Sequence, residues 1–173
     1  VDNSVPGYIG IIIGSVGMLS VPISLAAYRE QGILRRFRAT PVHPLVVMGA
    51  RLMVSSFVTL LGIVPLYVSG RIFYDLMVPT APWAVVLGIA LSTFSFLSIG
   101  LVLASVLPTA NAALATGMAI FYPMMFISGA GMPRQMLPST LLRIGDFLPL
   151  THVVNVIQDL WMGDGWNLAS LAY

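Results

Sequence analysis

The sequence predicts an all-α polytopic membrane protein, a helical bundle with an amphipathic cytoplasmic helix on one side and extracellular interfacial or re-entrant helices on the other. Of its 173 residues, 58% are hydrophobic and 8% are charged, and the mean hydropathy is +0.94. Such a chain has too few polar groups to cover a soluble globule. Four stretches approach the roughly 20 apolar residues that cross a bilayer, and none contains an acidic residue. These observations exclude a soluble domain.

The four predicted spans cover about residues 8–27, 45–68, 83–107 and 112–128. Arg51 is the only charged residue inside them, and it lies near the start of its span, where its long stem can reach the interface. A further apolar stretch starts at about residue 166, and the sequence stops before that stretch could cross. The sequence also begins without Met, so we expect an internal piece of a longer protein that lacks at least part of its last span.

Arginine bias sets the orientation that we expect. The loop between the first two spans holds four arginines and one acidic residue: Arg29, Glu30, Arg35, Arg36 and Arg38. Short arginine-rich loops stay in the cytoplasm, so this loop and the turn at 108–111 are predicted on the cytoplasmic side. Residues 69–82 and 129–165 then lie outside. The three tryptophans fall at that outer interface, as an aromatic belt requires: Trp83, Trp161 and Trp166.

Residues 29–38 of the cytoplasmic loop have the pattern of a short amphipathic helix. At about 100° per residue, Ile33, Leu34 and Phe37 share one side, and the arginines lie away from them. Two prolines end the helix and precede the next span: Pro41 and Pro44. The pattern has two interpretations. Periodicity alone favours a helix that lies on anionic lipid headgroups, and the other interpretation is a docking element on which a soluble partner pushes.

The outer segment contains two amphipathic patterns, at 133–148 and 150–162, and each is too short to span a membrane. Both predict an apolar stripe, and Pro149 separates them. Two such helices in tandem are expected to lie in the interface or to re-enter the membrane, with a plain surface cap as the alternative. The residues that mark this pair are Pro133, Leu137, Leu141, Pro149, His152 and Trp161.

Several kinds of chemistry are excluded by the residues that the sequence lacks. It has no lysine, so it offers no phosphate-binding P-loop lysine and no Schiff base, and any ATP hydrolysis must occur on another chain. It has no cysteine, and its two histidines, His43 and His152, are predicted on opposite sides of the membrane. We therefore predict no catalytic, cofactor-binding or metal-binding residues. The few arginines lie among apolar runs and do not indicate nucleic-acid binding.

Small residues and prolines inside the spans predict close packing and bends. Gly10 and Gly14, then Gly100 and Ala104, have the small-xxx-small spacing that lets helices approach, within one chain or across a dimer. Pro22 is one of three prolines expected to bend a span. Hydroxyl, aromatic and Met side chains are candidates for a substrate path, with ordinary packing as the alternative: Ser92, Ser95, Thr116, Phe121, Tyr122, Met125 and Phe126.

Two separated motifs resemble one family. The run from Tyr28 to Pro41, YREQGILRRFRATP, resembles the region after the second span of ABC-2 type exporter permeases. The outer stretch resembles the segment before the last span of the same family: Ser128 to Pro133, Met136 to Pro138, Leu148 to His152 and Leu160 to Gly163. Both motifs occur in the expected order and on the expected sides.

This resemblance implies a six-span permease of which spans two to five are present. It implies a second permease and two cytoplasmic ATPase subunits as partners, with ATP and Mg²⁺ on those subunits and no cofactor here. Glu30 to Phe37 would be the coupling helix, and the residues assigned to ATPase coupling are Arg29, Glu30, Gly32, Ile33, Leu34, Arg35, Arg36, Phe37 and Arg38.

The expected function is ATP-driven export of a hydrophobic drug, a lipid or a glycan across the inner (plasma) membrane of a prokaryote. The outer re-entrant helices would then lie near the exit of the path, and membrane lipids would surround the spans. The alternative is a structural or channel-like integral membrane protein that has no ATPase partner, in which the loop arginines bind only anionic lipid.

Overall fold

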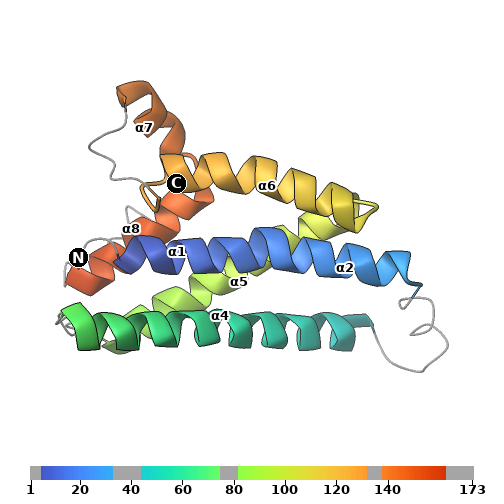
Figure 1. Cartoon of the computed structure of the whole chain (residues 1–173), viewed down its shortest axis with the longest axis horizontal. Helices are drawn as coiled ribbons and strands as arrows, with labels where there is room; N and C mark the ends of the chain where they lie inside the picture. Colours follow the sequence, from blue (N-terminus) through green and yellow to red (C-terminus); the bar gives the residue numbers. More distant parts are fainter. Residues whose placement is uncertain (1–4, 33–43, 75–81, 132–137, 163–173) are drawn as a thin grey trace.

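The computed structural model describes residues 5–32, 44–74, 82–131 and 138–162 (Figure 1). All secondary structure in these ranges is helical: α1 (Val5–Ser15), the π-helical turn η1 (Val16–Ser20), α2 (Val21–Glu30), α4 (Pro44–Tyr74), α5 (Pro82–Val106), α6 (Ala110–Ile127), α7 (Ser139–Gly145) and α8 (Pro149–Met162). Four of the helical stretches are long and apolar enough to cross a membrane. The prediction of an α-helical membrane protein is confirmed.

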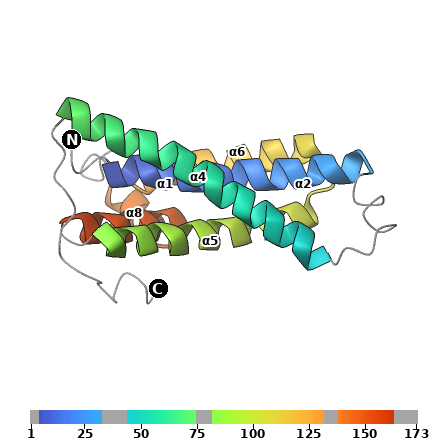
Figure 2. The ribbon, with the colours of Figure 1, turned by 90° about the horizontal axis from the view of Figure 1, so that it is seen from below.

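The first of these stretches is one continuous rod from Val5 to Glu30, formed by α1, η1 and α2. Figure 1 shows α4, this rod and α6 side by side, and Figure 2 shows α4 crossing the rod at an angle. α4 has 31 residues, which at 1.5 Å per residue gives about 46 Å, more than the hydrocarbon core of about 30 Å. The chain therefore presents membrane-length helices with short α7 and α8 added at one end.

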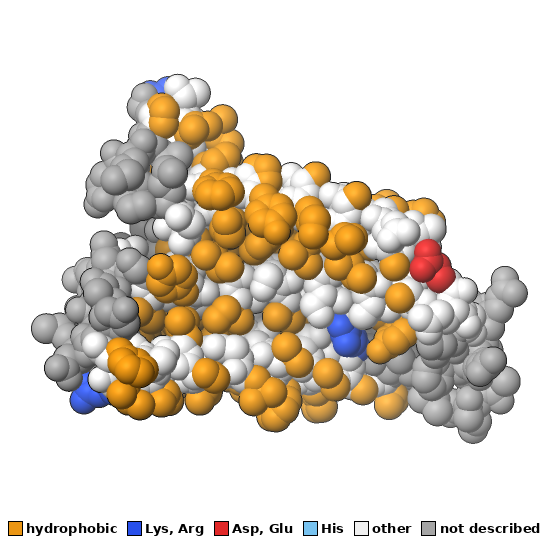
Figure 3. All heavy atoms as spheres, viewed as in Figure 1, with side chains coloured by type: hydrophobic (Ala, Val, Ile, Leu, Met, Phe, Trp, Pro, Cys, Tyr) orange, Lys and Arg blue, Asp and Glu red, His pale blue; other side chains and the backbone are white. Residues whose placement is uncertain are grey.

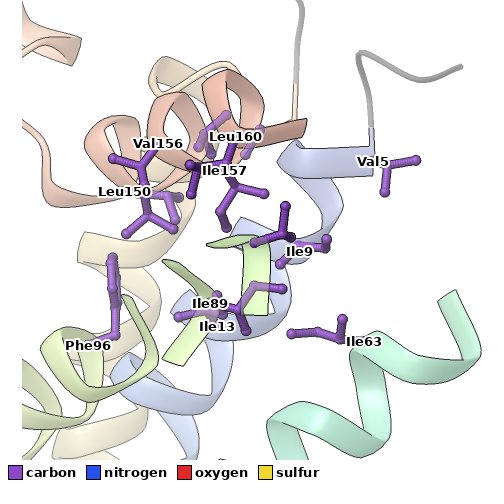
Figure 4. Packing of buried hydrophobic residues seen from close by; sticks show 14 of the residues in the cluster. Val5, Ile9, Ile13, Ile63, Ile89, Phe96, Leu150, Val156, Ile157 and Leu160 are labelled. Atoms are coloured by element: carbon purple, nitrogen blue, oxygen red, sulfur yellow. The ribbon is translucent and has the colours of Figure 1, made fainter. Parts of the chain in front are cut away.

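The core lies where α1, α5 and α8 meet, near the Val5 end of the rod. Ile9 and Ile13 of α1 are 1% exposed, and the close-up view shows them between Ile89 of α5, Ile157 of α8 and their neighbours (Figure 4). A Cβ at Gly10 would lie 2.8 Å from Val154 Cγ2 of α8. The missing side chain therefore lets α8 approach, and this small residue of the first span packs within the chain.

The outward surface of the bundle is apolar. α4 exposes Met53, Phe57 and Leu61, and orange side chains cover much of the face drawn in Figure 3. In water so large an apolar surface would have to be covered by a partner, but in a bilayer the lipid tails cover it. This exposure explains why the spans show no polar face.

The first outer helix is shorter than the sequence predicts. The periodic pattern runs over 133–148, but α7 covers Ser139–Gly145 and is followed by a turn at 146–148. Pro138 precedes α7 in an extended conformation, with φ −58° and ψ 148°, so the helix begins only after it. Pro133 and Leu137 lie outside the described residues.

Candidate functional site at the Arg29–Glu30 end of the rod

The last turn of α2 lies against the turn that joins α5 and α6. Helix α5 ends at Val106, and α6 begins at Ala110. Thr109 is the N-cap of α6, and its hydroxyl accepts a hydrogen bond from the Ala112 N–H at 3.1 Å. The acidic side-chain atoms in Figure 3 lie where the ends of α2 and α6 meet. Two adjacent residues of α2, Arg29 and Glu30, reach across to this turn.

Arg29 binds the carboxyl end of α5. Its Nη2 donates to the Ala104 carbonyl oxygen at 2.8 Å, and its Nη1 donates to the Leu107 carbonyl oxygen at 3.3 Å. The last carbonyls of a helix have no helical donor, and they form the negative end of its dipole. The guanidinium group of Arg29 supplies both hydrogen-bond donors for these carbonyls and a positive charge at the negative end of the helix dipole.

Glu30 binds the amino end of α6. Its Oε1 accepts a hydrogen bond at 3.2 Å from the N–H of Ala110, the first residue of that helix. The first N–H groups of a helix lack helical acceptors and form its positive end, which a carboxylate complements. We call Arg29, Glu30 and the bound turn at 107–110 the charged clamp, because two opposite charges hold two opposite helix ends.

The structure corrects the expected start of the amphipathic helix. Arg29 and Glu30 belong to the first span, because α2 continues to Glu30 and the chain then turns at Gln31 and Gly32. Gly32 has φ +67°, the left-handed conformation that ends helices and that glycine adopts without strain. The remaining predicted coupling residues lie outside the described residues: Ile33, Leu34, Arg35, Arg36, Phe37 and Arg38.

A second feature of the first span, which the sequence pattern does not predict, is the wide helical turn η1. Val21 N–H donates to the carbonyl of Val16, five residues back, and Pro22 has no N–H. In a regular α-helix the N–H groups at positions 21 and 22 would donate hydrogen bonds to the carbonyls of Gly17 and Met18. Both carbonyls therefore lose their regular donors. Pro22 was the available signal, and it indicated only a bend.

The carbonyls of this wide turn lie against glycines of two other helices. A Cβ at Gly117 of α6 would lie 2.7 Å from the Met18 oxygen, and a Cβ at Gly100 of α5 would overlap the Gly17 oxygen. Only glycine leaves room for so close an approach, in which a Cα–H can contact a carbonyl. The predicted small-residue packing at Gly100 is therefore contact within the chain.

The candidate path residues do not form one surface. Ser92 and Phe121 are buried, and a Cβ at Gly14 of α1 would lie 2.7 Å from the Phe121 ring, so this ring packs in the core. Ser95, Tyr122 and Phe126 are exposed on α5 and α6. The last two candidates are half-buried: Thr116 and Met125.

The outer helices place their marker residues differently from one another. Helix α8 buries its apolar stripe against α1 and α5. On α8, Pro149 is exposed and His152 is half-buried, and on α7, Leu141 is half-buried. Trp161 is 7% exposed and makes an edge-on contact with Tyr67 of α4, with ring centroids 5.9 Å apart. The prediction that Trp161 belongs to an interfacial belt is therefore wrong, because its indole packs inside the bundle.

Fold and site together define a multi-pass α-helical membrane protein whose first span is tied to two later spans by charge and by close packing. The chain belongs to the ABC-2 type transporter family, whose family model matches residues 2–161. It is 26% identical over 174 aligned positions to the inner membrane transport permease YhhJ of Escherichia coli, covering 94% of this chain and 45% of YhhJ.

A second relative is nodulation protein J of Rhizobium leguminosarum bv. viciae, which is 32% identical over 75 residues, 43% of this chain and 29% of that protein. The chain thus spans less than half the length of these relatives. No solved structure matches significantly.

Proposed function

We propose that the chain is the membrane-spanning part of a permease subunit of an ATP-driven exporter. It would pair with a second permease in a prokaryotic inner membrane and carry a hydrophobic drug, a lipid or a glycan. Family membership and the likeness to a transport permease support this proposal. The observation that carries it is the charged clamp, which ties α5 and α6 to the base of the segment assigned to coupling.

The clamp suggests how force would pass through this chain. A separate cytoplasmic ATPase would supply the energy by binding and hydrolysing ATP. Movement of the segment after Gly32 would act first on the last turn of α2. Because Arg29 holds the end of α5 and Glu30 holds the start of α6, both helices would move with that turn.

The exposed side chains of α5 and α6 indicate which side of the bundle the substrate path would follow. Ser95, Tyr122 and Phe126 are exposed on α5 and α6, and we assign them to the side that faces the second permease and the substrate. Helix α8, buried against α1 at the Val5 end, would form the outer re-entrant element near the exit. The wide turn η1 lies between the Val5 end and the Glu30 end of the rod, where its close packing on Gly100 and Gly117 would hold the rod against α5 and α6.

The test uses the full-length permease, co-expressed with its genomically adjacent ATPase and reconstituted in lipid nanodiscs. ATP hydrolysis is compared for wild type, Arg29→Gln and Glu30→Gln, with Arg143→Gln as the matched control. Arg143 is exposed on α7 and is not part of the clamp. We expect an intact complex whose turnover falls several-fold in both clamp variants and is unchanged in the control.

Two results would contradict the proposal in different ways. If the wild-type permease and the ATPase do not associate, the exporter assignment fails for this pair. If they associate and both clamp variants turn over like wild type, the exporter assignment stands and the clamp has no part in coupling.

A further inference from the structure

Arg51 places a positive charge inside a membrane-length helix. It lies seven residues after Pro44, the first residue of α4, and therefore about 10 Å along the helix axis. The apolar stretch of α4 that qualifies as a span, Gly49–Phe73, contains it. The span begins only two residues before Arg51, so the charge lies near one boundary of the membrane, at a depth that its long stem and a lipid headgroup can both reach.

The contacts of Arg51 leave its charge without a counter-ion among the described residues. Its Nη2 donates to the carbonyl oxygen of Ser20 at 3.2 Å and to the Ser20 hydroxyl at 3.4 Å, and both acceptors are neutral. Its Nε is buried and has no hydrogen-bond partner in the part of the chain that the structure describes. Glu30, the acid nearest along the first span, accepts from Ala110 instead.

Other unused donors lie close by on the same helix. The hydroxyl of Ser55, a residue only 2% exposed, has no partner among the described residues, and neither has the hydroxyl of Ser56. Residues 51 and 55 are four apart and share a helix face. A guanidinium with an unpartnered Nε–H, one helical turn from the unpartnered hydroxyl of Ser55, is suited to an anion that has several acceptor oxygens.

The surroundings indicate where such an anion comes from. Val54 and Val58 of α4, three and seven residues after the arginine and on the same side of the helix, are 53% and 46% exposed, so the helix beside the arginine presents an apolar surface to the bilayer. Basic side-chain atoms lie between α2 and α4 within the length of α4 in Figure 3, bordered by apolar side chains. A ligand that reaches this position from the lipid needs an anionic head and apolar tails.

We propose that Arg51, with Ser20 and Ser55, binds the phosphate of an anionic phospholipid between α2 and α4. The phosphodiester supplies the missing negative charge and acceptor oxygens for the guanidinium, and the acyl chains lie along the exposed side chains of α4. Since Ser20 is the last residue of η1, the bound lipid also braces the wide turn against α4. This inference does not depend on the exporter assignment.

The test measures which lipids the full-length permease retains. Protein is reconstituted in nanodiscs made of equal parts phosphatidylglycerol and phosphatidylcholine, and retained lipid is identified by native mass spectrometry. We expect wild type to enrich phosphatidylglycerol about fivefold. Arg51→Gln should abolish the enrichment, Arg51→Lys should keep part of it, and Ser55→Ala should lower it.

Controls separate this site from general charge attraction. Arg71→Gln makes the same change of charge in the same helix, at its other end, and should leave the enrichment unchanged. Equal retention of both lipids by wild type would overturn the proposal, and this result needs no variant to fold. An equal loss of phosphatidylglycerol enrichment in the Arg51→Gln and Arg71→Gln variants would overturn it as well. Arg51-dependent binding of inorganic phosphate in phosphatidylcholine discs, without lipid enrichment, would assign the site to a soluble anion and overturn the lipid assignment.

Discussion

The first span meets α5 and α6 at two places, and different forces hold them. At the charged clamp, exposed side chains of α2 bind the ends of both helices through hydrogen bonds and dipoles. At the wide turn, backbone carbonyls of η1 lie against buried glycines, with no side chain between them. Solvent and salt weaken the first contact but do not reach the second. The wide turn therefore suits a permanent joint, and the clamp suits a joint that can change.

The largest expected effect comes from filling the permanent joint. In Gly100→Val, the new side chain would overlap the Gly17 carbonyl oxygen, which belongs to the backbone and cannot rotate away. We expect overpacking to cost about 3 kcal/mol or more and to reduce the yield of folded protein sharply. Thermal unfolding monitored by size-exclusion chromatography measures the change.

Gly49→Val is the matched control for that substitution. A Cβ at Gly49 of α4 would meet nothing within 4 Å, so this variant should fold like wild type. If Gly100→Val unfolds at the wild-type temperature, the close packing of η1 on α5 is wrong.

The next effect compares the core with the lipid-facing surface. Ile157 of α8 is fully buried, while Ile72 of α4 is 71% exposed. Ile157→Ala should cost about 2–5 kcal/mol because it leaves a cavity between α8 and α1. Ile72→Ala removes the same atoms where lipid tails can fill the space, so its melting temperature should differ little from that of wild type. Equal losses would mean that α8 is not packed into the bundle.

Hydropathy was sufficient to predict four membrane-length apolar helices, because a helix in lipid must be apolar wherever it touches lipid. It could not distinguish α8, whose apolar stripe is buried by protein, from a helix lying at the interface, and so Trp161 was assigned to the wrong environment. Likewise, the periodic pattern at 133–148 continued through Pro138, where the backbone is extended. Periodicity reports which residues are apolar, and it does not report what covers them.

The clamp and the wide turn were not predictable, for a different reason. Arg29 and Glu30 are separated by 75 to 80 residues from the groups that they bind, and those groups are backbone atoms, which leave no trace in the side-chain pattern. Local periodicity therefore grouped both residues with the amphipathic helix predicted over 29–38. The carbonyls of η1 are likewise invisible in the sequence, although Pro22, Gly100 and Gly117 are the residues that such a contact requires.

The smallest expected change in stability, and the most informative about function, is at the clamp. Each clamp residue is exposed and binds a helix end, an interaction of about 0.3–1 kcal/mol that salt screens. Glu30→Gln keeps an acceptor oxygen near Ala110 N–H and removes only the charge. Its melting temperature should therefore fall slightly at low salt and match that of wild type at high salt.

Comparing the size of this effect with the change in turnover decides what the clamp does. If the clamp only stabilises the fold, Glu30→Gln should lower the melting temperature slightly and leave the rate of ATP hydrolysis close to that of wild type. Both small differences should vanish at high salt. A joint that transmits movement should lower turnover several-fold in Glu30→Gln while the melting temperature changes by only a few degrees. If turnover and melting temperature return to wild-type values together as salt is raised, the clamp is a structural contact, and force must pass from the first span to α5 and α6 through the wide turn.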